Sequence, residues 1–145
     1  MLEDLRGKAV LITGASIGIG AAAALAFGRL GANVAVHYNK NAEAAEAVCA
    51  AIRKLGSKAV AIGGDLGVPG TAKQVVEESA KQLGRLDILL NNAGAMIRRA
   101  PFLELDTELY EAAMNLNVES VIEASQAAVP HMEKQGGGAI INVGS

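Results

Sequence analysis

Residues 8–20 read KAVLITGASIGIG, an apolar run that passes into a glycine-rich turn and then into an alanine-rich stretch. Residues 8–13 predict a buried strand, and residues 18–30 predict a helix. The glycines let the backbone bend tightly and approach a ligand, and the start of the helix offers unpaired N–H groups and a positive dipole end to a pyrophosphate. Gly20 would also let the helix pack closely on the strand. The alternative interpretation is a sharp turn that binds no ligand.

The same alternation continues along the chain. We expect further strands at residues 33–38, 58–62, 86–90 and 139–143, and further helices at residues 42–55, 71–83, 107–114 and 118–135. Strand–helix–strand alternation with short connections indicates parallel strands joined by right-handed crossovers in one α/β domain. Glycines follow four of the predicted helices, where left-handed C-terminal caps are expected, and two polar residues are candidate N-caps. These are Gly31, Gly56, Gly84 and Gly136, and Asn41 and Asp106.

Composition narrows the class of protein. The chain has 145 residues, a formal net charge of −2 and 51% hydrophobic residues, of which few are aromatic. The charge argues against a chain that attracts nucleic acid, and no apolar run approaches the roughly 18 residues that span a membrane. The N-terminus does not resemble a signal peptide, and the single cysteine, Cys49, indicates a reducing compartment, so we expect a cytoplasmic protein. No Cys/His cluster has metal-ligand spacing, so we expect no metal site.

Five ordered motifs resemble those of the classical short-chain dehydrogenase/reductase family. Residues 13–20 match the family's TGxxxGxG turn, and residues 91–94 match its NNAG motif. Asp65 matches the acidic residue beside the adenine, and Asn117 matches the catalytic-site Asn. Residues 142–145 match the segment that ends in the catalytic Ser. The resemblance is closest to 3-oxoacyl-[acyl-carrier-protein] reductases and glucose/sugar-alcohol dehydrogenase-like members. It implies a Rossmann-type, doubly wound parallel sheet with five strands in the order 3-2-1-4-5, from which the family's C-terminal strands are absent.

The resemblance also implies a dinucleotide site. The turn residues that would hold the adenine-side ribose and the pyrophosphate are Gly14, Ser16, Ile17, Gly18, Ile19 and Gly20, with Ile17 in the place of a basic residue of the family. Asp65 and Leu66 would hold the adenine, although Asp65 alone is typical of a solvated turn. Asn92, Ala93 and Gly94 would lie at the switch point between the first and fourth strands, although they also fit a simple Asn-Gly turn.

The end of the second predicted strand bears on the choice of cofactor. An NAD site usually places Asp or Glu there to bind the ribose 2′-OH, but this position holds Tyr38, followed by Asn39 and Lys40. The missing carboxylate removes repulsion against a 2′-phosphate, and Lys40 could pair with that phosphate. We therefore expect NADP in preference to NAD, with a solvated surface charge as the alternative interpretation of Lys40.

The implied catalytic residues are Ser145, which would hydrogen-bond the substrate carbonyl, and Asn117, which would hold a water in a proton relay. Asn117 also fits a helix N-cap. His37 and His131 are interpreted as surface or structural residues. The family's Tyr-x-x-x-Lys pair is not formed by Tyr38 or Tyr110. We therefore expect residues 1–145 to be the N-terminal dinucleotide-binding portion of a longer domain, inactive alone, with an open apolar edge at the fifth strand.

The resulting hypothesis is an NAD(P)-dependent oxidoreductase that moves hydride between nicotinamide and a small carbonyl or secondary-alcohol substrate. We expect no nucleic-acid or membrane partner. A homo-oligomer is expected through the helix Val118–Gln135, where Ala124, Ala127 and Ala128 would permit close helix packing. The alternatives are a non-catalytic dinucleotide-binding module or truncated paralogue, and a self-standing structural half-domain.

Overall fold

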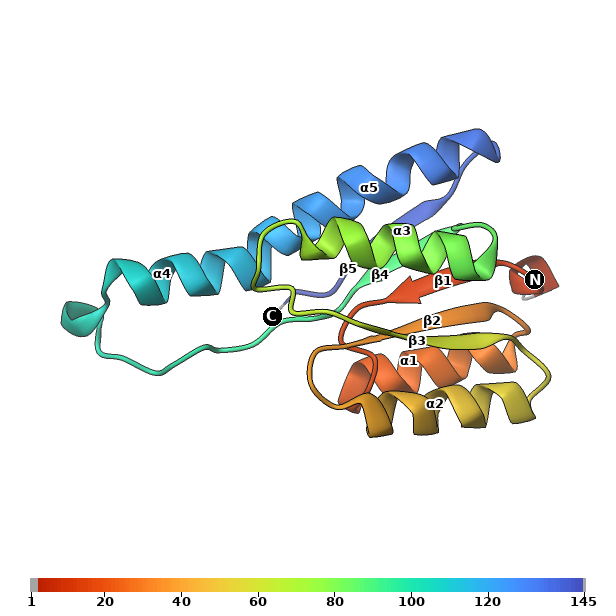
Figure 1. The fold of residues 1–145 in the computed structure, drawn as a ribbon, viewed down its shortest axis with the longest axis horizontal. Coiled ribbons are helices and arrows are strands. Elements are labelled where there is room, and N and C mark those ends of the chain that lie inside the picture. Colours follow the sequence, from red (N-terminus) through yellow and green to blue (C-terminus); the bar gives the residue numbers. More distant parts are fainter. Residues whose placement is uncertain (1–2, 145) are drawn as a thin grey trace.

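A parallel sheet of five strands forms the centre of the computed structural model, which describes residues 3–144 (Figure 1). The strands are β1 (Ala9–Ile12), β2 (Asn33–Tyr38), β3 (Ala59–Gly63), β4 (Ile88–Asn91) and β5 (Ala139–Asn142). Their order is β3-β2-β1-β4-β5, which confirms the predicted doubly wound arrangement. In register, Ile12 at the end of β1 lies between Val36 and Leu90, and β2 and β4 continue past it by two residues and one residue.

Helices cover both faces of the sheet. On one face lie α1 (Gly18–Arg29) and α2 (Ala42–Lys54), and on the other lie α3 (Thr71–Leu83) and α5 (Ser120–Lys134) (Figure 1). Successive residues of β1 point to opposite faces: Val10 and Ile12 belong to one apolar core, Ala9 and Leu11 to the other. All four side chains are fully buried, which explains why the strand reads as an unbroken apolar run.

The predicted capping residues are confirmed at the helix ends. Asn41 accepts a hydrogen bond from the Ala44 N–H at 3.0 Å, and Asp106 accepts one from the Leu109 N–H at 2.7 Å. The four glycines that follow helices all have positive φ: Gly31 at 81°, Gly56 at 90°, Gly84 at 83° and Gly136 at 88°. Local capping chemistry is therefore sufficient to set these boundaries.

One predicted boundary is wrong. The expected break before residue 118 does not occur, because α4 (Thr107–Met114) continues through a π-helical turn, Asn115–Glu119, directly into α5. Asn117 is part of this continuous helix, and its side-chain Nδ2 donates to the Ala113 carbonyl oxygen at 2.9 Å. A π turn admits an extra residue without ending the helix, and such turns often mark functional sites.

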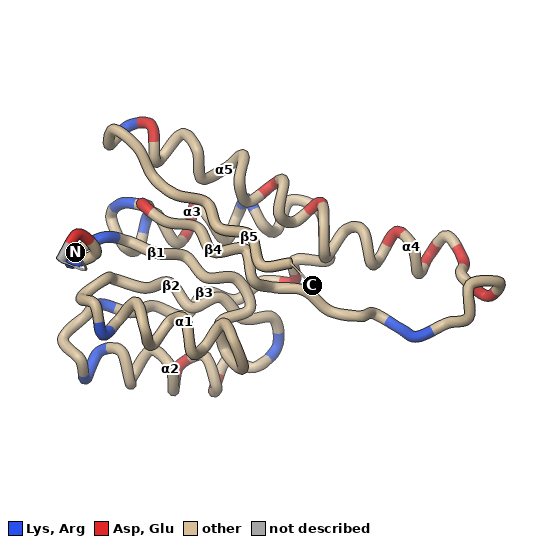
Figure 2. The backbone as a smooth tube through the Cα atoms, turned by 180° about the vertical axis from the view of Figure 1, so that it is seen from behind, with Lys and Arg blue, Asp and Glu red and all other residues tan. Residues whose placement is uncertain are grey.

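Segment 95–106 and α4 extend beyond the carboxyl ends of the strands (Figure 1). Figure 2 shows basic residues on this segment and acidic residues along α4. Arg98 pairs with Asp106 at 3.2 Å, which ties the segment to the start of the helix. No helix within residues 3–144 is long and apolar enough to cross a membrane.

The edge strand β5 leaves apolar side chains in solvent, as expected. Ile140 and Ile141 are 36% and 44% exposed.

Asp87 lies at the end of the sheet where the strands begin. Its buried carboxylate accepts hydrogen bonds from the Ala9 N–H at 2.8 Å and from Arg85 Nη2 at 2.6 Å. Asp87 therefore fixes the start of β1 beside β4.

Candidate functional site

The glycine turn between β1 and α1 is drawn tightly onto its neighbours. A Cβ on Gly20 would lie 2.2 Å from the Gly14 carbonyl oxygen and 2.6 Å from Asn92 Nδ2, both well inside van der Waals contact. Gly14 has φ +62° and lies against Ala93. Only glycine fits at these two positions, so the close packing expected at Gly20 is confirmed.

The N-terminus of α1 is open to a ligand. Ile17 precedes the helix without a side-chain cap, and the first turn contains no acidic residue. Ile17 and Ile19 are 67% and 73% exposed, so no apolar cover lies over this end. The unpaired N–H groups and positive dipole end of α1 therefore suit an anionic group such as a pyrophosphate.

Asn92 clamps the glycine turn to the end of β4. Its Nδ2 donates to the carbonyl oxygens of Thr13 at 3.0 Å and Gly14 at 3.1 Å. In return, Thr13 Oγ1 accepts from the N–H groups of Asn92 and Ala93, each at 3.0 Å. Thr13 was not among the predicted site residues; its place as the polar end of an apolar strand is the signal that could have identified it.

His37, in β2, joins the glycine turn to the segment that follows β3, a contact that was not expected from the sequence. Its Nδ1 accepts from the Gly14 N–H at 3.0 Å, so Nε2 carries the proton and donates to the Gly64 carbonyl oxygen at 2.9 Å. The Ala15 N–H donates to the His37 carbonyl oxygen at 2.8 Å. The side chain is buried, and this burial lowers its pKa below the ordinary value against the opposing effect of the Gly64 hydrogen bond. Its structural interpretation is confirmed.

A cleft of about 600 Å³ opens between the end of β4, the π turn and the end of β5. The predicted residues Ile19, Asn92, Ala93, Gly94 and Asn117 all line it. The structure thus brings together residues from three separate motifs. The segment that precedes Ser145 contributes to the same cleft, whereas Ser145 lies outside the described residues.

Asn117 reaches across to the segment that follows the NNAG motif. Its Oδ1 accepts from the Ala95 N–H at 3.1 Å, and its Nδ2 donates to the Ala95 carbonyl oxygen at 3.0 Å. The alternative interpretation of Asn117 as a helix N-cap is wrong, because the residue lies within the π turn. Its amide instead fixes the wall of the cleft.

The residues predicted at the adenine end lie apart from the cleft, after β2 and β3. Asp65 is exposed and accepts from the Gly67 N–H at 3.0 Å, whereas the Leu66 side chain is buried in the core. The Tyr38 ring lies on Gly63, and a Cβ added to this glycine would meet the ring at 3.0 Å. Asn39 and Lys40, which follow Tyr38, are exposed.

Other reactive groups do not join the site. Burial raises the pKa of the Cys49 thiol to about 11, so this side chain stays protonated near neutral pH. Among residues 3–144, no group of three or more His, Cys, Asp or Glu side chains could hold a metal ion. Ser16 and Gly18 belong to the turn that leads into α1, at the same end of the sheet as the cleft.

Comparison with known proteins agrees with this geometry. Residues 8–145 match the sequence profile of the short chain dehydrogenase family. L-rhamnose 1-dehydrogenase (NAD(P)(+)) of Sphingomonas sp. is 38% identical over 145 residues, which cover 99% of this chain and 57% of that protein. 3-Oxoacyl-[acyl-carrier-protein] reductase of Staphylococcus aureus is 37% identical over 138 residues, which cover 95% of this chain and 56% of that protein.

A solved structure gives the same result. A short chain dehydrogenase from Burkholderia cenocepacia in complex with NADP superposes with a TM-score of 0.89 at 43% identity, covering 97% of this chain and 56% of that chain. The chain therefore spans a little over half the length of the relatives that it matches. The sheet order, the glycine turn and the matched sequence lead to one conclusion: the chain belongs to the short-chain dehydrogenase family.

Proposed function

We propose that residues 1–145 bind a nicotinamide dinucleotide, with the pyrophosphate at the N-terminus of α1 and the nicotinamide in the cleft. The main support is the junction where Gly20, Gly14 and Asn92 meet without room for a side chain on Gly20. Such a junction leaves the uncapped end of α1 free for an anion, and it opens directly onto the cleft that Asn92 and Asn117 line.

The adenine end of the dinucleotide would lie over the ends of β2 and β3, beside Asp65 and the backbone of Leu66. NADP is the expected cofactor, because no carboxylate stands at Tyr38 to repel a 2′-phosphate and the exposed Lys40 can reach one. The relative named for NAD(P)(+) and the structure that holds NADP support nicotinamide dinucleotides as a class.

The reaction proposed for the full-length protein is reduction of a carbonyl or oxidation of a secondary alcohol. The nicotinamide, when bound, supplies or accepts the hydride. Ser145 would donate a hydrogen bond to the substrate oxygen, and Asn117 would hold a water for proton transfer beside the Ala95 backbone. We propose residues 1–145 as the dinucleotide-binding portion of one domain, with the Tyr-x-x-x-Lys pair supplied by the remainder.

A homo-oligomer through the α5 region forms part of the proposal, but by a different surface from that expected. Ala124, Ala127 and Ala128 are buried in the chain's own core against α3, so they are not available to a partner. The exposed side chains of Ile122 and Val129, at 52% and 40%, offer an apolar surface instead. We propose the cytoplasm as the compartment, because a chain with a single cysteine is typical of a reducing environment.

Hydride transfer tests this function. The full-length protein that carries this segment is mixed with NADPH or NADH and a panel of ketones, and loss of the reduced nicotinamide absorbance is followed. We expect ketone-dependent oxidation with NADPH and none from residues 1–145 alone. The alternative outcome is that the full-length protein binds the dinucleotide without turnover. If no ketone in the panel is reduced by NADPH or NADH, and no alcohol is oxidised by NADP or NAD, the non-catalytic module is favoured.

A further inference from the structure

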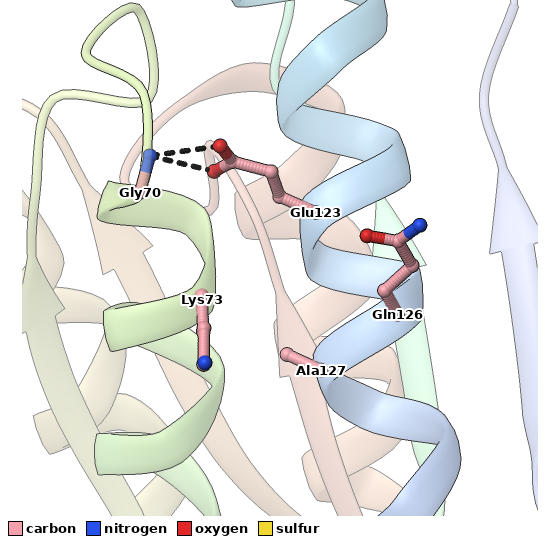
Figure 3. Close-up of a pocket in the computed structure, with 5 residues that line it drawn as sticks. All are labelled: Gly70, Lys73, Glu123, Gln126 and Ala127. Atoms are coloured by element: carbon pink, nitrogen blue, oxygen red, sulfur yellow. Dashed lines mark hydrogen bonds between the residues drawn. The ribbon is translucent and has the colours of Figure 1, made fainter.

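Glu123 of α5 caps the N-terminus of α3, a helix that is remote from it in sequence. Both of its carboxylate oxygens accept from the Gly70 N–H, Oε1 at 2.8 Å and Oε2 at 3.0 Å (Figure 3). The contact closes one end of a small surface hollow of about 210 Å³ between the two helices. Lys73 and Gln126 line the same hollow, and in Figure 3 the Lys73 side chain points away from this contact.

The α3 helix has no cap of its own. Its N-cap residue is Gly70, which has no side chain to accept from the first N–H groups, and no acidic residue occurs in the first turn. A carboxylate at this end meets both the unpaired donor and the positive end of the helix dipole. Glu123 therefore satisfies one of the unpaired N–H groups at the start of α3, that of the N-cap residue itself, which in a capping box is paired by a local Glu or Gln.

The contact anchors one end of the segment predicted to hold the adenine. Residues 64–70 connect β3 to α3 and contain Asp65 and Leu66. At its first end, the Gly64 N–H donates to the Tyr38 carbonyl oxygen at 3.0 Å. At its second end, Gly70 is held by Glu123 from across the interface between α3 and α5. The segment is thus fixed at both ends, but by different parts of the molecule.

The helix that provides Glu123 also continues from the π turn that provides Asn117. One continuous helix therefore contacts the wall of the cleft through Asn117 and the adenine segment through Glu123. Asn117 and Glu123 are six residues apart, which corresponds to about 9 Å of helix rise, so one short stretch of helix links the two contacts.

We propose that Glu123 is a positioning residue for the adenine end of the dinucleotide, acting through Gly70 on the segment that contains Asp65 and Leu66. The inference rests on the proposed function of the site. It assigns no contact between Glu123 and the ligand itself, because the carboxylate is directed at the backbone of Gly70.

Binding of the two halves of the dinucleotide tests this role. The dissociation constants of ADP-ribose and of reduced nicotinamide mononucleotide are measured by calorimetry for the unchanged chain, Glu123→Ala and Glu123→Gln. Gln126→Ala, on the same wall of the hollow, is the matched control. Loss of a cap typically costs a helix about 1 kcal/mol, so we expect the ADP-ribose dissociation constant to rise about fivefold in Glu123→Ala. Glu123→Gln keeps an oxygen acceptor and should lie between.

We expect reduced nicotinamide mononucleotide to bind all four proteins equally, and exchange of the Gly70 amide hydrogen, followed by NMR, to quicken in Glu123→Ala. If ADP-ribose binds Glu123→Ala as tightly as the unchanged chain, the inference is overturned while the proposed function stands. Equal weakening of both ligands would overturn it as well, since it would indicate general loosening. No ADP-ribose binding by the unchanged chain would overturn both the inference and the proposed function.

Discussion

Replacing His37 with leucine should loosen the glycine turn and weaken nucleotide binding. Leucine fills a similar apolar volume but leaves the Gly14 N–H and the Gly64 carbonyl oxygen without their partners. A buried polar group left unpaired costs about 1–3 kcal/mol. Both glycines are half-buried, so we take the lower limit for each and expect a loss of about 2 kcal/mol in the free energy of unfolding.

The pH dependence gives the same substitution a second measurable effect. Because burial holds the pKa of His37 below its ordinary 6.5, the unfolded chain binds a proton first as the pH falls. The contribution of His37 to stability is therefore complete above pH 6.5 and declines below it, by up to about 1.4 kcal/mol per pH unit until the folded pKa is reached. No charged side chain contributes to this shift, so His37→Leu should remove the decline.

Urea unfolding at pH 7 and pH 5 measures the loss of stability and its pH dependence. Titration with NADPH measures the effect on nucleotide binding. His131→Leu is the control, because His131 pairs with Glu77 on the surface at 3.0 Å, a contact worth at most about 1 kcal/mol. We expect His37→Leu to bind NADPH at least about fivefold more weakly. This corresponds to about 1 kcal/mol for ordering the glycine turn at Gly14 once its hydrogen bond to His37 is lost. Unchanged stability at pH 7 together with unchanged NADPH affinity would refute the role assigned to His37.

Three further substitutions test other parts of the account. Asn92→Leu leaves the carbonyl oxygens of Thr13 and Gly14 unpaired, so the free energy of unfolding should fall by about 2 kcal/mol in urea; no change would contradict the clamp. Asp87→Asn removes the charge of a buried carboxylate that pairs with two half-exposed cations, so the free energy of unfolding in urea should fall by about 1–2 kcal/mol, and no change would contradict its role at the start of β1. Burial alone would raise the pKa of Asp87, but its hydrogen bonds and cationic neighbours hold it below 3.8, so stability is lost as the pH falls below 3.8 and this loss should be smaller in the variant. Lys40→Glu should weaken NADPH binding at least about tenfold and leave NADH binding within about twofold, because only NADPH carries a 2′-phosphate; equal effects on both would exclude Lys40 as its partner.

The strands, most of the helices and the motifs that line the cleft could be predicted from the sequence. Local signals set the helix ends, since the Asn41 and Asp106 side chains cap helices within the same short stretch of chain. The apolar run before Gly14 predicted β1, and the order of the strands followed from the family resemblance. The cleft residues Asn92 and Asn117 were likewise identified from motifs that resemble those of the family.

The remaining features depend on contacts between distant segments. His37 is hydrogen-bonded 23 residues back to Gly14 and 27 residues ahead to Gly64, so its role has no local signature. Glu123 is directed at a glycine 53 residues earlier. The π turn was missed for a related reason: Asn117 suits an N-cap by its residue type, whereas the backbone stays helical through it and its amide bonds to Ala95, 22 residues earlier.

Calorimetric titration of residues 1–145 with NADPH, compared between the unchanged chain and Gly20→Ala, tests the central claim most directly. The added Cβ would lie 2.2 Å from the Gly14 carbonyl oxygen, so the turn must shift away from the end of α1. We predict saturable binding at one site by the unchanged chain and its loss in Gly20→Ala, with the circular dichroism spectrum retained. Absence of saturable binding by the unchanged chain, or equal affinity in the two proteins, would contradict the dinucleotide site.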